Sequence, residues 1–436
     1  MSADRRHFLR ATGAAFAALA ASGCVRAPLS GIASDKVVGY GDLISDPAGM
    51  LDLPPGFSYR VISSLGDAMT DGGSVPDKAD GMGCFDLRNG KWALVRNHEL
   101  SPGNDSGGAT GLAYDTVARS MVPLPGGTTT IILDANTLAV ERQYRSLSGT
   151  IRNCAGGVTP WGSWLSCEEN VSRADGRINK DHGYVFEVPA DSPGPVDPVP
   201  LKAMGRFNHE AAAVDPATGI VYLTEDRSDS LFYRFIPTRT GKLAAGGRLQ
   251  ALALENARDT RNWSAITVTG GSWLPVRWID VDDVEAPNDD LRIRGAAAGG
   301  SLFARGEGIW MGSGELYFAC TNGGAAKLGQ IFRLKPGRTQ DQLQLFFEST
   351  DPEQFNYGDN LTVAPNGHLI VCEDQYTDDA VNYLRGVDTD GVAYPLGRLR
   401  MKTELAGACY APDGRTLFLN IYSPTRTLAI TGPWRA

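Results

Sequence analysis

The sequence lacks an excess of basic residues, and beyond its first residues it lacks long apolar runs. Its 436 residues include 41 Lys and Arg against 50 Asp and Glu, which gives a net charge of −9. An acidic chain cannot neutralise the phosphates of a duplex, so we expect no nucleic-acid partner. The only long apolar stretch lies near the N-terminus, which excludes a multi-span membrane protein. To bind an anionic small substrate, the protein would need local Arg residues or metal ions that reverse the negative electrostatic potential of its surface.

Several motifs and periodicities are also missing. A helical period is nearly absent, no C-x-x-C spacing marks a structural zinc site, and no G-x-S-x-G motif supplies a serine nucleophile. Turn residues are abundant: 52 Gly and 25 Pro separate short apolar strands, often as Asn-Gly or Asp-Gly. This pattern predicts an all-β fold.

The first 24 residues have the features of an export signal. Arg5-Arg6 stands before an Ala-rich stretch that is too short for a transmembrane helix, as in twin-arginine (Tat) signals. Ala21–Cys24 then resembles a lipobox, so we expect lipid on Cys24 and anchorage to a membrane; ordinary cleavage beside an incidental cysteine is the alternative. We therefore expect residues 1–24 to be a signal and residues 25–436 a single domain. The protein would lie in the periplasm, or be anchored to the outer membrane or cell surface.

One hairpin unit recurs six times along the chain. Each unit is a polar residue, an apolar strand, a turn, a second apolar strand and another polar residue. Because the two strands of a hairpin run antiparallel, the polar residues at its two ends lie side by side. The units span Asp80–Glu99, Cys154–Glu169, Glu210–Asp226, Glu307–Asn322, Asp359–Asp374 and Glu404–Asn420.

The length of the repeat indicates how the hairpins are arranged. Six units leave roughly 70 residues for each, which is enough for a four-stranded blade and its loops. The repeat therefore predicts a six-bladed β-propeller, in which the inner strands line a central channel and the open hairpin ends meet at one mouth. That mouth would hold Asp80, Glu99, Cys154, Glu168, Glu169, Glu210, Glu225, Asp226, Glu307, Asp359, Glu373, Asp374 and Glu404.

This crowd of carboxylates points to bound cations. Like charges at close range repel strongly in a low dielectric, so the acids cannot all ionise alone. Carboxylates select hard cations such as Ca²⁺, and one thiolate at Cys154 favours a transition metal beside them. Any single acid could instead be a solvated surface residue, and Cys154 a core thiol or half of a disulfide. The residues by themselves would also suit Mn²⁺ or Zn²⁺.

Other cysteines and two histidines have more ordinary interpretations. Cys167, Cys320 and Cys372 stand just before the second end of a unit, where they should face away from the channel and pack as small hydrophobic residues. The even number of cysteines permits disulfides in an exported protein, with a pairing that the sequence leaves open. His98 and His209 each precede an acid and are expected to pack against it or orient it.

Arginine is the second signal at the mouth. Arg305 lies two residues before Glu307, and Arg206 lies four before Glu210. Beside an acidic ring filled with cations, a guanidinium would grip an anion such as phosphate through a bidentate fork. Each arginine could equally form a salt bridge to a neighbouring acid.

Distinctive motifs stand in order along the chain. They are N-H-E (97–99), N-C-A-G-G-V-T-P-W-G-S-W-L-S-C-E-E-N (153–170), G-R-F-N-H-E-A-A-A-V (205–214), V-Y-L-T-E-D (221–226), R-G-E-G (305–308), G-D-N-L-T-V (358–363), C-E-D (372–374) and A-P-D-G-R-T-L-F-L-N (411–420). Together they resemble the PhoX family of alkaline phosphatases. The long motif around Cys154 is the specific one, whereas the A-P-D-G turn is common to propellers.

The resemblance implies a six-bladed propeller whose mouth holds Fe³⁺ and Ca²⁺ ions, which would activate an oxygen nucleophile. It implies that Cys154, Glu210 and Glu307 bind iron and that Arg305 holds phosphate. Further acids would bind iron or Ca²⁺; these are Glu99, Glu169, Asp226, Asp359 and Glu373.

The expected activity is hydrolysis of small-molecule phosphate monoesters by a monomeric exported enzyme. Two alternatives remain open. One is a Ca²⁺-dependent propeller hydrolase of phosphotriesters or lactones, which would not need Cys154 on iron. The other is a non-catalytic, lipid-anchored envelope propeller that binds a protein partner, for which apolar and aromatic residues would be expected at the mouth in place of acids.

Overall fold

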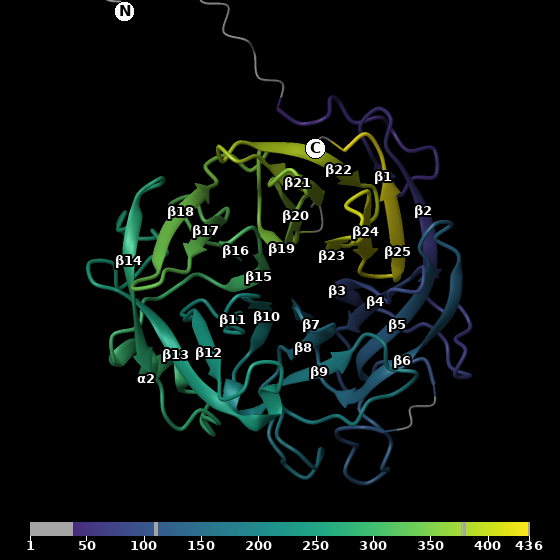
Figure 1. Ribbon diagram of the computed structural model, residues 1–436, viewed down its shortest axis with the longest axis horizontal. Helices are drawn as coiled ribbons and strands as arrows, with labels where there is room; N and C mark the ends of the chain where they lie inside the picture. Colours follow the sequence, from purple (N-terminus) through teal and green to yellow (C-terminus); the bar gives the residue numbers. More distant parts are fainter. Residues whose placement is uncertain (1–37, 109–111, 376, 378–380, 435–436) are drawn as a thin grey trace, which may run out of the picture. The chain divides into compact units, whose positions relative to one another are not determined.

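In the part of the chain that the structure describes, six antiparallel hairpins surround a central channel (Figure 1). This computed structural model describes residues 38–108, 112–375, 377 and 381–434, so the predicted signal (residues 1–24) and Cys24 lie outside it. Each hairpin joins an inner strand to the strand that follows it. The pairs are β3 (Ala79–Asp86) with β4 (Lys91–His98), β7 (Asn153–Val158) with β8 (Ser163–Glu168), β10 (His209–Val214) with β11 (Val221–Glu225), β15 (Gly306–Met311) with β16 (Leu316–Cys320), β19 (Gly358–Val363) with β20 (Leu369–Glu373), and β23 (Leu405–Tyr410) with β24 (Thr416–Ile421).

Outer strands extend the hairpins into sheets. The sheets have the strand orders β3-β4-β5-β6, β7-β8-β9, β2-β25-β24-β23 and β1-β22-β21-β20-β19, and a nine-stranded sheet forms where β14 pairs with β18 and so joins the β10 and β15 hairpins. These outer strands are β1 (Leu51–Asp52), β2 (Ser58–Ser64), β5 (Gly126–Asp134), β6 (Val140–Thr150), β9 (Val185–Pro189), β12 (Tyr233–Pro237), β13 (Gly247–Leu254), β14 (Trp273–Asp280), β17 (Gln330–Lys335), β18 (Gln342–Glu348), β21 (Tyr383–Val387), β22 (Ala393–Leu399) and β25 (Arg426–Thr431). The fold is all-β and of the propeller type, which confirms that part of the sequence prediction.

Helix is scarce in this fold. The described residues contain one α-helix, α2 (Leu291–Ala297), and the short 3₁₀ turns η1 (Lys202–Met204) and η2 (Leu243–Ala245). None of these described helices is long and apolar enough to cross a membrane.

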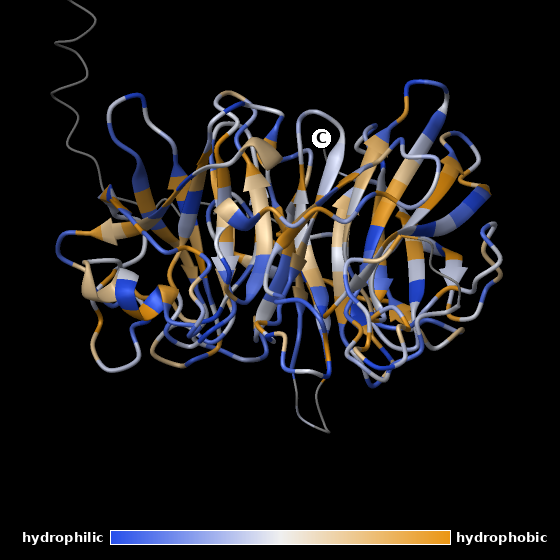
Figure 2. Ribbon diagram, turned by 90° about the horizontal axis from the view of Figure 1, so that it is seen from below, coloured by the Kyte–Doolittle hydropathy of each residue, from blue (hydrophilic) through white to orange (hydrophobic). Residues whose placement is uncertain are grey.

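Apolar side chains fill the space between the sheets, and Figure 2 shows apolar stretches along the strands with many polar residues in the loops. The thiols of Cys167, Cys320 and Cys372 are fully buried in these apolar clusters, as predicted. Within the described residues every cysteine is unpaired.

Small residues let the inner strands pack closely around the channel. Neighbouring inner strands contact one another all the way round, from β3 through β7, β10, β15, β19 and β23 and back to β3. A Cβ atom at Gly157 would lie 1.9 Å from the carbonyl oxygen of Ala212 on the next inner strand. Between the inner strands a cavity of about 10 Å³ is lined by residues that include Gly81 and Gly308, and a larger one of about 220 Å³ is lined by residues that include Val158, Ala212 and Trp310.

This close approach predicts a large effect of one added methyl group. The substitution Gly157→Ala should lower the free energy of unfolding by about 1–3 kcal/mol, because the main chain of the next strand must move. Urea unfolding of the two proteins measures the difference. Gly194→Ala is the matched control, since a Cβ there meets nothing within 4 Å; equal losses in the two variants would contradict the packing argument.

Candidate active site

Every inner strand carries a β-bulge at its mouth end. In the first hairpin Ala79 pairs with His98 and Met82 pairs with Arg96, so two residues of β3 stand opposite one residue of β4. The other five hairpins show the same shift. A bulge re-aims the side chain of the extra residue. In five hairpins the first bulge residue is an acid or a cysteine that lines the pocket at the mouth, namely Asp80, Cys154, Glu210, Glu307 and Asp359.

A second position of the repeat also faces this pocket. This position is the residue that follows the last paired residue of the second strand. Its N–H donates to the carbonyl oxygen of the residue just before the inner strand. In the second hairpin this bond runs from Glu169 to Arg152 and is 2.9 Å long. This bond turns the residue back over the hairpin end. The same position holds Glu99, Asp226 and Asp374, and all four acids line the pocket.

The residue before this second position points away, and this corrects one predicted ligand. Glu373 does not line the pocket; its carboxylate accepts hydrogen bonds from Arg385 Nε at 2.7 Å and from the N–H groups of Asn356 and Tyr383. Because successive residues of a strand face opposite sides, Asp374 stands in the pocket instead. Glu168 and Glu225, which were also expected at the mouth, are turned away in the same manner.

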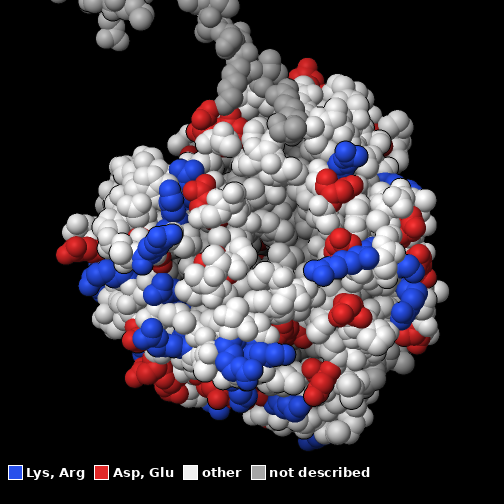
Figure 3. Space-filling view, in the orientation of Figure 1, with Lys and Arg blue, Asp and Glu red and all other residues white. Residues whose placement is uncertain are grey.

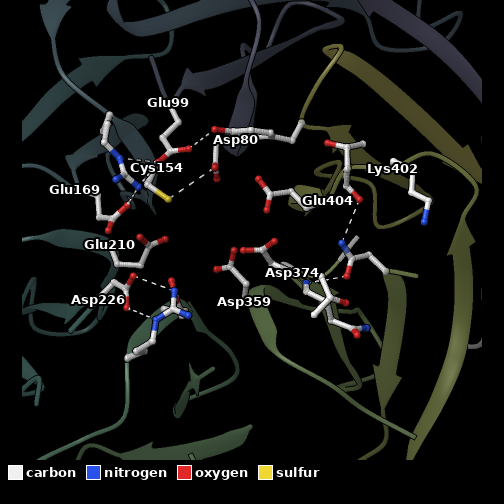
Figure 4. Close-up of a pocket in the computed structure, with 18 residues that line it drawn as sticks. Asp80, Glu99, Cys154, Glu169, Glu210, Asp226, Asp359, Asp374, Lys402 and Glu404 are labelled. Atoms are coloured by element: carbon white, nitrogen blue, oxygen red, sulfur yellow. Dashed lines mark hydrogen bonds and ion pairs between the residues drawn. The ribbon is translucent and has the colours of Figure 1, made fainter. Parts of the chain in front are cut away.

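The inward-facing acids meet in a cavity of about 600 Å³ (Figure 4). One face of the molecule is hollowed at its centre, with basic and acidic residues interspersed around it (Figure 3). Among the described residues that line the cavity, no side chain is aliphatic and Tyr422 is the one aromatic residue. The remaining lining is polar or charged and includes one further acid, Glu404; the other residues are Arg152, Arg305, Gln375, Thr377, Asn382, Lys402 and Thr403.

Two subsets of these side chains are spaced as metal ligands are. Ligand atoms of Glu99, Cys154 and Glu169 all lie within 4.8 Å of one another, and so do those of Glu210, Glu307 and Asp359. Carboxylate oxygens with one sulfur atom suit hard cations beside a transition metal. The donor set therefore fits the cations that the sequence predicts.

Burial makes it energetically costly for these acids to ionise without a partner. Both carboxylate oxygens of Glu210 and Oδ1 of Asp80 are buried with no hydrogen-bond partner among the described residues. Burial, together with the neighbouring carboxylates, raises the pKa values of Asp80, Glu210 and Glu307 well above the ordinary range. Burial also raises the pKa of Asp359 to about 7. A bound cation would supply the missing partner and favour the ionised form.

Arg305 faces the pocket as predicted, whereas Arg206 does not. The Arg305 guanidinium donates from Nε and Nη2 to Asp226 at 2.7 and 3.0 Å and from Nη2 to Glu307 at 2.9 Å. Arg305 thus forms the salt bridges that one sequence interpretation expected, and it also lines the pocket; its contact with phosphate stays a prediction. Arg206 is buried and donates to the carbonyl oxygens of Val171 and Ala286.

Arg152 and Tyr422 are among the pocket residues that the sequence interpretation missed. Arg152 pairs with Glu99 and Glu169, and the hydroxyl of Tyr422 donates to Glu99. A signal for Arg152 was present, because it precedes Cys154 by two residues just as Arg305 precedes Glu307. No comparable spacing marks Tyr422.

A buried network behind the pocket was also missed. His182 is fully buried between Glu168, 2.6 Å from its Nδ1, and Asp115, 3.2 Å from its Nε2. Burial opposes a charge on this ring, but the two carboxylates outweigh burial and raise the pKa of His182 to about 9. By contrast, burial lowers the pKa of His209 to about 3. His98 and His209 contact main-chain or hydroxyl oxygens, and neither lines the pocket.

Comparison with known proteins agrees with this geometry. A family model described as alkaline phosphatase PhoX matches residues 38–141 and 132–425. The solved structure of Pseudomonas fluorescens PhoX, a complex with the transition-state analogue vanadate, has a TM-score of 0.68 and 19% identity over 88% of this chain and 96% of that chain. The gluconolactonase XC5397 from Xanthomonas campestris has a TM-score of 0.42 and 14% identity over 91% of this chain and 99% of that chain. None of the curated proteins compared matches the chain.

Fold, pocket and family match together define a β-propeller enzyme of the phosphoester hydrolase class. The chain belongs to the alkaline phosphatase PhoX family, whose model matches most of its length.

The charged network around His182 predicts a pH-dependent stability. The folded-state pKa of about 9 exceeds the ordinary value of 6.5, so the stabilisation is complete below pH 6.5 and is lost as the pH rises through about 9. That shift corresponds to about 3 kcal/mol. His182→Gln should therefore cost about that much free energy of unfolding near neutral or lower pH and much less in alkaline solution. Urea unfolding of both proteins across this pH range measures the difference, and a difference independent of pH would contradict the assignment.

Proposed function

We propose that this enzyme is a metal-dependent alkaline phosphatase that hydrolyses phosphate monoesters in the acidic pocket. The observation that carries the proposal is the repeated bulge, which delivers Asp80, Cys154, Glu210, Glu307 and Asp359 to one cavity. Membership of the PhoX family supports the reaction class. The vanadate bound by the Pseudomonas fluorescens protein supports an oxyanion as the ligand of this mouth.

Fe³⁺ and Ca²⁺ are the proposed cofactors. Cys154, Glu210 and Glu307 would hold iron, and Glu99, Glu169, Asp226 and Asp359 would hold iron or Ca²⁺, with Asp80 and Asp374 beside them in the cavity. Such ions, when bound, neutralise phosphate oxygens and activate an oxygen nucleophile.

The chain's own residues bind and orient the substrate. Arg305 offers planar N–H donors to the phosphoryl oxygens, and its contacts with Asp226 and Glu307 hold the guanidinium in place. Because the lining is polar, the alcohol part of the ester should be small and hydrophilic.

The proposal also covers the number of blades and the location of the protein. The nine-stranded sheet would count as two blades joined by β14, which gives six blades in one domain over residues 25–436. An exported monomer, carried by the Tat-type signal and tethered through Cys24, would release phosphate from organic esters outside the cytoplasm.

Chelation tests the reaction class. The exported protein should hydrolyse p-nitrophenyl phosphate, and EGTA should abolish most of this activity, with recovery on adding Ca²⁺, because the carboxylates need cations to bind the phosphate dianion. Steady-state rates before and after chelation measure this. Activity that is unchanged by EGTA, or turnover only of phosphotriesters or lactones, would contradict the proposal.

Two acids at neighbouring places in the repeat should respond differently to removal of charge. Asp359→Asn should reduce the bound metal per protein, since Asp359 lines the pocket. Glu373→Gln should keep the metal but lower the free energy of unfolding by about 3–5 kcal/mol, because it leaves Arg385 buried without its partner. Elemental analysis and urea unfolding give the two readouts; metal loss in Glu373→Gln with unchanged stability would restore Glu373 as a ligand.

A further inference from the structure

Arg152 and Arg305 occupy the same position of the repeat in two hairpins. Each is the last residue before its inner strand, and each has a left-handed backbone, with φ of 49° and 52°. Each carbonyl accepts the N–H of the residue that follows the second strand, at 2.9 Å from Glu169 and 3.0 Å from Thr321. Residues other than glycine adopt this backbone only rarely, and here it brings two guanidinium groups to one pocket.

The two guanidinium groups also make similar contacts. Arg152 donates from Nε to Glu99 at 2.8 Å and from Nη2 to Glu169. As described above, Arg305 contacts Asp226 and Glu307. In both cases one carboxylate ends the preceding hairpin and the other belongs to the arginine's own hairpin. Each arginine thus connects two neighbouring hairpins across the rim of the pocket.

Arg152 keeps donors that face the cavity. Its side chain lines the pocket and is 39% exposed, compared with 19% for Arg305. Nη1 of Arg152 has no hydrogen-bond partner among the described residues. A guanidinium carries five N–H donors in a fixed plane, so two carboxylate contacts leave donors available to an anion.

The buried network holds the backbone of Arg152 from beneath. Glu168 Oε1 accepts the N–H of Ile151 at 2.9 Å, and the same oxygen lies 2.6 Å from His182. The peptide between Thr150 and Ile151 is therefore held by the buried Glu168 carboxylate, and the N–H of Arg152 itself donates to the carbonyl oxygen of Leu100 at 3.0 Å. A side chain held in this way loses little freedom when it binds a ligand.

We propose that Arg152 is a second phosphate-binding arginine, which grips the phosphoryl group from the side of Cys154 while Arg305 grips it from the side of Glu307. The proposal rests on the proposed function, because it names a further residue of the same site. A phosphate monoester presents three terminal oxygens, and two planar forks can share them through directed, charge-assisted hydrogen bonds.

Phosphate binding by variants of the full exported protein tests this assignment. Isothermal titration calorimetry with inorganic phosphate gives Kd without any need for turnover, and elemental analysis of the same samples gives the metal content. Arg152→Met should weaken phosphate binding by about 10- to 100-fold with the metal content unchanged. Arg152→Lys should recover part of the affinity, because it keeps the charge but not the fork.

Arg177→Met is the matched control. Arg177 also donates from Nε and Nη2 to a carboxylate, that of Asp175, but its side chain is 89% exposed and outside the pocket. Its phosphate Kd should equal that of the unaltered protein. If Arg152→Met does not fold, the phosphate Kd of Arg152→Lys is compared with that of Arg177→Met. We then expect phosphate binding by Arg152→Lys to be weaker by at least several-fold.

Two results would overturn the proposal. A phosphate Kd within about twofold of the unaltered protein in the Arg152 variants would exclude a phosphate contact. Loss of metal together with phosphate affinity would assign Arg152 to holding Glu99 and Glu169 instead. If the unaltered protein binds phosphate but hydrolyses no monoester, the proposed function is wrong. The role of Arg152 is then still decided by the phosphate Kd of its variants.

Discussion

The β-bulge at the mouth end of each inner strand is the constraint on which the site depends. A regular strand would send alternate side chains to opposite faces and would place only some of these acids at the mouth. The bulge inserts one residue and re-aims it, and five hairpins use that residue to carry a carboxylate or a thiol. In the sixth hairpin the bulge begins at Gly407, whose N–H instead bonds Asn360 at 3.0 Å. The ring of acids and Cys154 around the pocket is therefore a property of the backbone repeat as much as of the residue types.

The same hairpin ends divide the acids into two kinds. Of those that face the pocket, Glu210 has no hydrogen-bond partner at either carboxylate oxygen and Asp80 has none at Oδ1 among the described residues, and a cation would favour their ionisation. Those that face away tie the loops together: Glu373 holds Arg385 and the N–H of Asn356, and Glu168 holds His182 and the N–H of Ile151. The outward acids fix the loops from which the inward groups project. Of two adjacent residues at one strand end, one thus stabilises the loops and the other lines the pocket.

Much of this arrangement could be predicted from the sequence, and the failures have physical causes. Apolar strands between turns, with polar residues at similar spacings, were enough to predict the propeller-type fold and a pocket that contains Cys154, Glu210 and Glu307. The spacing could not separate Glu373 from Asp374, because the turn after the second strand decides which of two adjacent acids faces inward. His182 was missed because its partner Asp115 is 67 residues away in the chain, where no local pattern signals the contact.

The central claim is that the bulge residues of this propeller bind cations. X-ray diffraction from crystals of the exported protein, recorded on both sides of the iron absorption edge, tests it most directly. We expect an anomalous peak within bonding distance of Cys154 Sγ and of the Glu210 carboxylate, with further cation density among the remaining acids of the pocket. A pocket without cation density, in which the bulge residues contact only one another and water, would contradict it.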